Sequence, residues 1–178
     1  MIDQSGKTVW ITGASSGIGE ALAKTFVANG GSAVLSGRNL AELQRVADET
    51  GAAERCLILP FDTQDFACLP AMLDKALNFQ GQVDVLVNNA GISQRSLAVE
   101  TDFAVYERIV GVDLLAPIAL TQALLPHLLA RGAGQLVMIS SVAGKAGVPM
   151  RTAYCAAKHG LIGYSDALRS EVAGQGVK

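Results

Sequence analysis

The stretch "KTVWITGASSGIGEALAKTFVANG", residues 7–30, decides the fold class. A short apolar run leads into the glycine-rich turn "TGASSGIG" (12–19), after which apolar residues recur at intervals of three and four. This order is typical of a buried strand followed by an amphipathic helix that ends at Gly30. Glycines at such a turn let the backbone approach a pyrophosphate, and the helix N-terminus faces the anion. An ordinary loop is the alternative, but the position between strand and helix favours nucleotide binding.

The same alternation continues along the chain, with short apolar runs bounded by Gly, Asn, Pro or Ser and helical patterns between them. Strand then helix, repeated about five times, requires crossover connections and a parallel sheet covered on both faces. We therefore predict a doubly wound, Rossmann-like α/β fold in one domain, residues 1–178, because no linker or repeat interrupts the pattern. The predicted strands are 7–12, 31–36, 55–60, 83–88 and 135–140, and the helices 17–30, 39–51, 65–81 and 101–131.

Composition excludes several classes of protein. Half of the 178 residues are hydrophobic and 17% are charged, which suits a globular domain rather than a disordered chain. The net charge of -2 lacks the basic excess of a nucleic-acid binder. Three cysteines without metal-ligand spacing indicate reduced thiols and no metal site. The N-terminus shows no signal-peptide pattern, and the apolar stretch 114–130 is interrupted by proline and polar residues, so we expect a cytoplasmic protein without a membrane span.

Arg38 and Asn39 follow the second predicted strand, in "LSGRN" (35–39). A site specific for NAD usually places Asp or Glu about 20 residues after the glycines, where it holds the ribose 2′-hydroxyl. Here the first carboxylate is that of Glu42. A cation matches the 2′-phosphate of NADP, which a carboxylate would repel. We predict NADP(H) in preference to NAD(H), the alternative being that Arg38 is a solvated loop residue.

Three further motifs follow in a fixed order: "NNAG" (88–91), Ser141 in "ISSVAG" (139–144) and "YCAAK" (154–158). With the glycine turn, they resemble the simple branch of the short-chain dehydrogenase/reductase family over nearly the whole chain. Tyr154 lies 13 residues beyond Ser141, the spacing seen in that family. The G-x-x-G-x-x-G spacing of the extended-branch epimerases differs from the G-x-x-x-G-x-G here. The resemblance implies an oxidoreductase that transfers a hydride between NADP(H) and a carbonyl or secondary alcohol.

The chemistry of such a reaction asks for the residue types in "YCAAK". Carbonyl reduction leaves an alkoxide that an acid must protonate. A tyrosine, with a reference pKa of about 10, is mostly neutral at pH 7 and can donate that proton, whereas oxidation needs the phenolate, which a neighbouring cation favours. Tyr154 and Lys158, four residues apart, share one helix face. Quoted alone, the pair also fits two polar residues on an amphipathic surface.

The resemblance assigns further roles. Tyr154 is the general acid or base, Lys158 also holds the nicotinamide ribose, and Ser141, with Ser140 as its competitor, hydrogen-bonds the substrate carbonyl. Asp113 stands where many relatives have an asparagine whose backbone helps to hold a water for proton relay. We leave open whether Asp113 supports that relay or is structural, and its charge would offset that of Lys158.

The resemblance also implies the residues that bind the cofactor. Asp62 matches the position that hydrogen-bonds the adenine amino group, with a helix N-cap as the alternative role. The full predicted set is Gly13, Ser15, Ser16, Gly17, Ile18, Gly19, Arg38, Asn39, Asp62, Asn89, Ala90, Gly91, Tyr154 and Lys158.

The chain differs from the family pattern at its C-terminus. Relatives continue into a sixth strand, a substrate lid and a seventh strand, so we expect a fragment or the ordered part of a longer protein, with the C-terminal strands missing. A non-catalytic nucleotide-binding or interaction protein of the same fold is the alternative. The intact Ser141, Tyr154 and Lys158 favour an enzyme with a small-molecule substrate. The resemblance also implies a homodimer or homotetramer.

Overall fold

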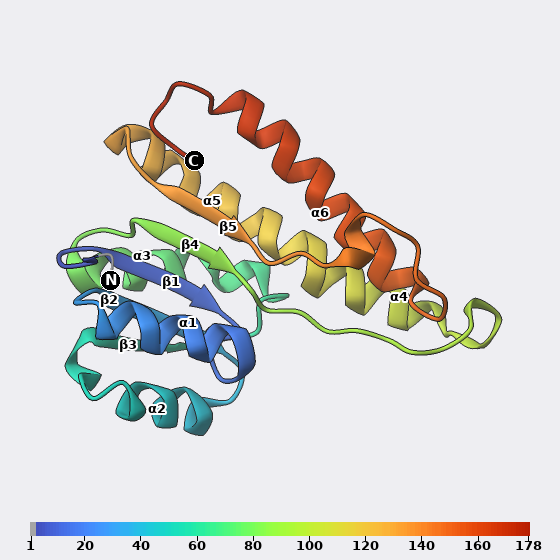
Figure 1. Cartoon of the computed structure of the whole chain (residues 1–178), viewed down its shortest axis with the longest axis horizontal. Coiled ribbons are helices and arrows are strands. Elements are labelled where there is room, and N and C mark those ends of the chain that lie inside the picture. The colour runs from blue at the N-terminus through green and yellow to red at the C-terminus, as the bar shows by residue number, and fades with distance from the viewer. Residues whose placement is uncertain (1–2) are drawn as a thin grey trace.

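The computed structural model describes residues 3–178 and contains a five-stranded sheet in the order β3-β2-β1-β4-β5 (Figure 1). All four strand pairs are parallel. From β1 the chain moves outward to β3 and then returns to place β4 on the other side of β1, so the strand order reverses between β1 and β4. Ligands of such sheets bind at this reversal, beyond the carboxyl ends of the strands. The strands are β1 (Thr8–Thr12), β2 (Ser32–Gly37), β3 (Cys56–Pro60), β4 (Val85–Asn88) and β5 (Gln135–Met138).

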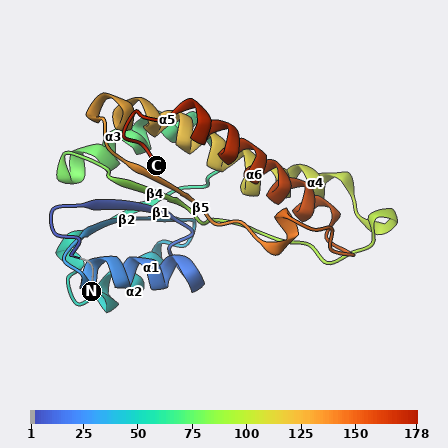
Figure 2. The ribbon, with the colours of Figure 1, turned by 45° about the horizontal axis from the view of Figure 1, so that its top comes forward.

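Helices cover both faces of the sheet, as Figures 1 and 2 show. One face carries α1 (Gly17–Ala28) and α2 (Leu40–Glu49). The other carries α3 (Leu69–Gln80), α5 (Ala116–Arg131) and α6 (Thr152–Glu171). The predicted doubly wound α/β fold is therefore confirmed. The assignment of residues 1–178 to one domain stays a prediction.

The core has two apolar layers, one on each side of the sheet. A smaller third cluster packs Ile109 against Ala153 and Ala157 of α6. Trp10 and Ile11, neighbours on β1, point to opposite faces and are both fully buried. Trp10 packs in the layer beneath α5, with Leu120, Leu124 and Leu128. Ile11 packs in the layer beneath α1 and α2. Burial on both faces explains why the strands read as continuous apolar runs.

The predicted helix 101–131 is not one regular α-helix. It comprises α4 (Phe103–Val110), a π-helical segment (Gly111–Leu115) and then α5. The whole stretch Phe103–Arg131 is long and apolar enough to cross a membrane, and half of its most apolar part is buried within the protein. Because a core helix meets the same criteria, the expectation that the chain has no membrane span stays a prediction.

The outer edge of β5 is partly paired by the last residues of the chain. Gly134 and Val177 form a parallel bridge. The Leu136 N–H donates to the Lys178 carbonyl (2.8 Å), and the Lys178 N–H donates to the Gly134 carbonyl (3.0 Å). Residues 177 and 178 therefore extend the sheet beside the first half of β5.

Candidate active site

The glycine turn packs directly against the segment that follows β4. Gly13 has a left-handed backbone (φ 65°), and a Cβ there would lie 2.9 Å from the Ala90 Cα. A Cβ at Gly19 would overlap the Gly13 carbonyl oxygen and the Asn89 side chain. Glycine at these two positions therefore permits the close approach of α1 to the strand ends.

Asn89 joins the ends of β1 and β4. Its side-chain Nδ2 donates to the carbonyls of Thr12 (3.0 Å) and Gly13 (3.1 Å). In return, the Thr12 hydroxyl oxygen accepts hydrogen bonds from the backbone N–H groups of Asn89 and Ala90, both at 3.0 Å. These bonds hold the two strand ends together at the point where the strand order reverses.

A cleft of about 310 Å³ opens beyond the carboxyl ends of the strands. Eight of the predicted cofactor-binding residues line it, and they come from the glycine turn and the ends of β2, β3 and β4. Within residues 3–178, Arg38 forms no ion pair, so its guanidinium has no carboxylate partner at the cleft. The cleft is lined by Gly13, Ser15, Ser16, Gly37, Arg38, Phe61, Asp62, Thr63, Asn89, Ala90, Gly91, Ile92, Arg108 and Val112.

Six of the predicted cofactor residues do not line the cleft: Gly17, Ile18, Gly19, Asn39, Tyr154 and Lys158. Gly17 and Ile18 form the first turn of α1, where the Ile18 side chain is 59% exposed. The Asn39 side chain caps α2 by accepting from the Glu42 N–H (3.2 Å). Asp62 lines the cleft and also accepts the Gln64 N–H (3.0 Å), which closes a local turn.

Tyr154 and Lys158 lie one turn apart on α6, and the Lys158 Nζ is 5.6 Å from the centre of the Tyr154 ring. The Lys158 side chain is only 5% exposed. Its ammonium donates to the Ile139 carbonyl (3.0 Å), at the end of β5. The strand end thus fixes the cation beside the tyrosine.

The two candidate serines have different surroundings. Ser141 begins the short 3-10 turn Val142–Gly144, and its Oγ accepts from the Ala143 N–H (3.2 Å). The Ser140 Oγ is buried and has no hydrogen-bond partner within the described part of the chain. A Cβ at Gly144 would lie 2.9 Å from this Oγ and 2.8 Å from the Lys158 carbonyl, so Ser140 faces the packed junction with α6.

Asp113 lies in the π-helical segment and is completely buried. Its Oδ1 accepts the Ile92 N–H (2.8 Å), and its Oδ2 lies 3.2 Å from the Lys158 Nζ as an ion pair without good hydrogen-bond geometry. Burial raises the pKa of this carboxyl above its usual value, against the opposing effects of Ile92 and Lys158. Single π-helical turns are frequent at functional sites. The structure thus brings Asp113, Lys158 and Tyr154 into one cluster.

The family is decided by comparison with known proteins. The family model described as short chain dehydrogenase matches residues 7–178. The chain belongs to the short-chain dehydrogenase family. The fold agrees: a short-chain dehydrogenase from Streptomyces avermitilis superposes with a TM-score of 0.93 at 34% identity, covering 100% of this chain and 64% of that chain. A metagenomic short-chain oxidoreductase in complex with NADP also gives 0.93, at 33% identity, covering 98% and 80%.

Curated proteins from other organisms are also similar to this chain in sequence. Dehydrogenase/reductase SDR family member 7 of Homo sapiens is 42% identical over 170 residues, which is 93% of this chain and 50% of the relative. Ketoacyl reductase HetN of Nostoc sp. is 37% identical over 178 residues, 99% of this chain and 62% of the relative. The chain therefore spans about half of the length of the curated relatives that it matches.

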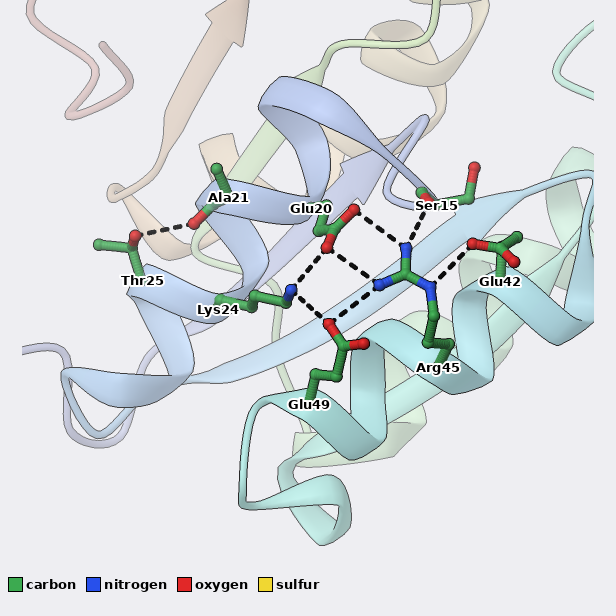
Figure 3. A network of polar contacts seen from close by, with 8 residues as sticks. All are labelled: Ser15, Glu20, Ala21, Lys24, Thr25, Glu42, Arg45 and Glu49. Carbon is green, nitrogen blue, oxygen red and sulfur yellow. Dashed lines mark hydrogen bonds and ion pairs between the residues drawn. The ribbon is translucent and has the colours of Figure 1, made fainter.

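In this chain, an ion-pair network supports the glycine turn from its outer side (Figure 3). The Arg45 guanidinium on α2 binds both carboxylate oxygens of Glu20, in the first turn of α1, at 3.1 Å, and it reaches the Ser15 carbonyl at 3.4 Å. Hydrogen bonds from Arg45 and then Lys24 lower the pKa of Glu20 to about 2. Glu42 and Glu49 complete the network.

Sequence reasoning missed several residues of the site. Thr63 follows Asp62 beyond β3, and its place at a strand end was an available signal. Arg108 reaches the cleft from α4, and no local sequence pattern indicates that it does so. Gln94 is only 8% exposed although it lies in the loop after β4, and a buried polar loop residue has no sequence signature.

Proposed function

We propose that this chain forms the cofactor-binding and catalytic part of an NADP(H)-dependent oxidoreductase, which transfers a hydride between the nicotinamide and a carbonyl or secondary alcohol. The observation that carries the proposal is the buried Lys158 ammonium 5.6 Å from the Tyr154 ring, held by Ile139 at the end of β5. Parallel sheets of this kind bind ligands at that end. The activity of the whole protein, which extends over about twice this length in the relatives, is part of the proposal.

The cleft fits a dinucleotide phosphate. Gly13 and Gly19, where a Cβ would clash, let the turn pack closely on the strand ends, so that the start of α1 lies beside the cleft. The N-cap residue Ser16 makes no side-chain cap, so the first N–H groups of α1 remain free for an anion. Arg38, Ser15 and Ser16 share the cleft, and the Arg38 guanidinium, which has no ion-pair partner in residues 3–178, suits the 2′-phosphate of NADP. The NADP complex of the metagenomic relative supports the same preference.

The proton chemistry falls to α6 and its neighbours. The bound cofactor supplies or accepts the hydride at the substrate carbon. In the reductive direction, the Tyr154 hydroxyl gives its proton to the developing alkoxide oxygen, and the Lys158 ammonium stabilises the phenolate left behind. Ser141 donates a hydrogen bond to the same oxygen. Oxidation of the alcohol runs these steps backward.

We also propose that the protein acts on a small-molecule substrate and that it assembles as a homodimer or homotetramer. Apolar side chains that face solvent near α4 support assembly, among them Phe103 (72% exposed) and Leu115 (46% exposed).

Three free cysteines support a reducing, cytoplasmic location.

The cofactor assignment is tested by titrating NADPH and NADH separately against the protein and its Arg38→Glu variant. We expect NADPH to bind the wild type at least about tenfold more tightly than NADH, and Arg38→Glu to remove this difference. Arg55→Glu is the matched control, because Arg55 is also exposed but does not line the cleft. Binding of NADH as tight as that of NADPH would refute the role of Arg38.

The catalytic assignment is tested by Tyr154→Phe in the full-length protein. We expect carbonyl reduction to fall by about 10²- to 10⁴-fold while NADPH binding changes by less than about threefold, because only the proton donor is lost. Tyr164→Phe, on the same helix, is the control and should keep its turnover. Unchanged turnover in Tyr154→Phe would sink the assignment.

A further inference from the structure

The helix that carries Tyr154 and Lys158 begins without a local cap. The N-cap residue of α6, Arg151, makes no side-chain cap. The first N–H groups of any helix lack partners within the helix, and a buried one needs a partner from elsewhere. Ala153, directly before Tyr154, is completely buried.

Gln94 supplies that partner from the loop after β4. Its Oε1 accepts the Ala153 N–H at 3.0 Å, across 59 residues of sequence. Its Nε2 donates to the Thr101 hydroxyl (3.4 Å), at the other end of the same loop. Both the carbonyl oxygen and the amide nitrogen of the Gln94 side chain are thereby hydrogen-bonded, and Gln94 is only 8% exposed.

Two further side-chain bonds join this loop and the adjoining α4 to the start of α6. The Arg151 guanidinium donates to the Ser93 hydroxyl (2.5 Å) and lies 6.0 Å from the centre of the Tyr154 ring. The Tyr106 hydroxyl, on α4, is 2.7 Å from that of Thr152. Both bonds are open to solvent, unlike the bond made by Gln94.

A strained residue marks the same junction. Met150 has a left-handed backbone (φ 65°), which is unfavourable for a residue with a side chain. Its carbonyl accepts the Ser96 N–H (3.1 Å) from the loop. Such a conformation persists where the surrounding contacts determine it.

We propose that Gln94 is a positioning residue for the proton donor: its buried bond to the Ala153 N–H holds the first turn of α6, and with it Tyr154, in register with the loop 92–101. The proposal rests on the proposed function, because it assumes that Tyr154 moves the proton. Lys158 lies one turn further along and has its own anchors in Ile139 and Asp113. Loss of the Gln94 bond therefore displaces the tyrosine more than the cation or the cofactor cleft.

Three variants separate the bond from simple packing. Gln94→Leu keeps the size of the side chain but has no acceptor, and Gln94→Glu keeps an acceptor oxygen. Gln44→Leu is the matched control, since Gln44 is exposed on α2 and, within residues 3–178, its side chain bonds only Asp48 of its own helix. Each is assayed for kcat, KM and NADPH affinity, and for amide hydrogen exchange over residues 152–158.

We expect Gln94→Leu to lower kcat about ten- to hundredfold and to speed exchange about tenfold, with NADPH affinity within about twofold of the wild type. Gln94→Glu should restore both kcat and protection to within about threefold, and Gln44→Leu should change neither. Equal losses in Gln94→Leu and Gln94→Glu, or a wild-type kcat in Gln94→Leu, would overturn the proposal. If the wild type reduces no carbonyl, the proposed function fails, and hydrogen exchange then decides the role of Gln94. Protection of residues 152–158 that is lost in Gln94→Leu and kept in Gln94→Glu supports this role. Equal protection in the two variants refutes it.

Discussion

One carboxylate, that of Asp113, sets the charge around the proposed proton donor. Asp113 is fully buried, its Oδ2 lies 3.2 Å from the Lys158 Nζ, and its pKa is raised by burial. A raised pKa means that the group is neutral in acid and ionises at a higher pH than an ordinary aspartate. Once ionised, it opposes the formation of a second anion, the Tyr154 phenolate, beside the same lysine.

Asp113→Asn should therefore make alcohol oxidation easier at lower pH. We expect the midpoint of the oxidation rate against pH to fall, because a negative charge beside Lys158 is removed. In acid, below the raised pKa of Asp113, variant and wild type should behave alike, and the curves should separate as the pH rises. The measurement is the pH profile of oxidation for both proteins, with the exposed Asp48→Asn as control. A midpoint that stays in place or rises would contradict this account.

At the scale of elements, the turn between β1 and α1 is held from two sides. Asn89 binds it from the strand ends, and the Arg45 network binds it from α2 (Figure 3). These contacts restrain the turn on both sides, so a side chain added at Gly19 strains it.

Gly19→Ala tests this dependence. The new Cβ would overlap the Gly13 carbonyl, so we expect NADPH binding to weaken at least about tenfold and the free energy of unfolding to fall by about 1–3 kcal/mol. Gly163→Ala, in α6, is the matched control: its Cβ would meet nothing, and the unfolding free energy should rise by up to about 1 kcal/mol. Titration and denaturant unfolding measure both quantities. Wild-type affinity in Gly19→Ala would show that the turn relaxes.

At the scale of the whole molecule, the cleft joins the two halves of the sheet. Its lining comes from β2 and β3 on one side of β1 and from the end of β4 and from α4 on the other. A ligand that fills it contacts segments more than 90 residues apart in sequence, from Gly13 to Arg108. Binding should thus oppose global unfolding rather than stiffen one loop.

Saturating NADPH should raise the unfolding temperature. At a concentration of about 100 Kd, linkage adds about 2.7 kcal/mol, which corresponds to about 5–10 °C for a domain of this size. NADH at the same concentration should give a smaller rise. Thermal unfolding followed by far-UV circular dichroism measures the shift, and an equal shift with Arg38→Glu would argue against binding of the 2′-phosphate at Arg38.

The pattern of strands and helices was open to prediction because it depends on local periodicity. Alternation of short apolar runs with three-and-four spacing requires a parallel sheet covered on both faces, and that fold is confirmed. Tyr154 and Lys158 share a helix face because of backbone geometry alone. Details within elements were less accessible: the predicted helix 101–131 contains a π-helical turn, and the Asn39 side chain, predicted to bind the cofactor, caps α2.

Which chemical groups follow each strand, and in what order, can be read from the sequence, since strand ends and helix faces are properties of neighbouring residues. How these groups meet depends on the packing of distant segments. The ion pair of Asp113 with Lys158 and the cap that Gln94 gives to α6 join residues far apart in the chain. Such contacts depend on how helices pack on the sheet and on which polar groups packing buries, and a buried polar group must find its partner wherever the fold places one.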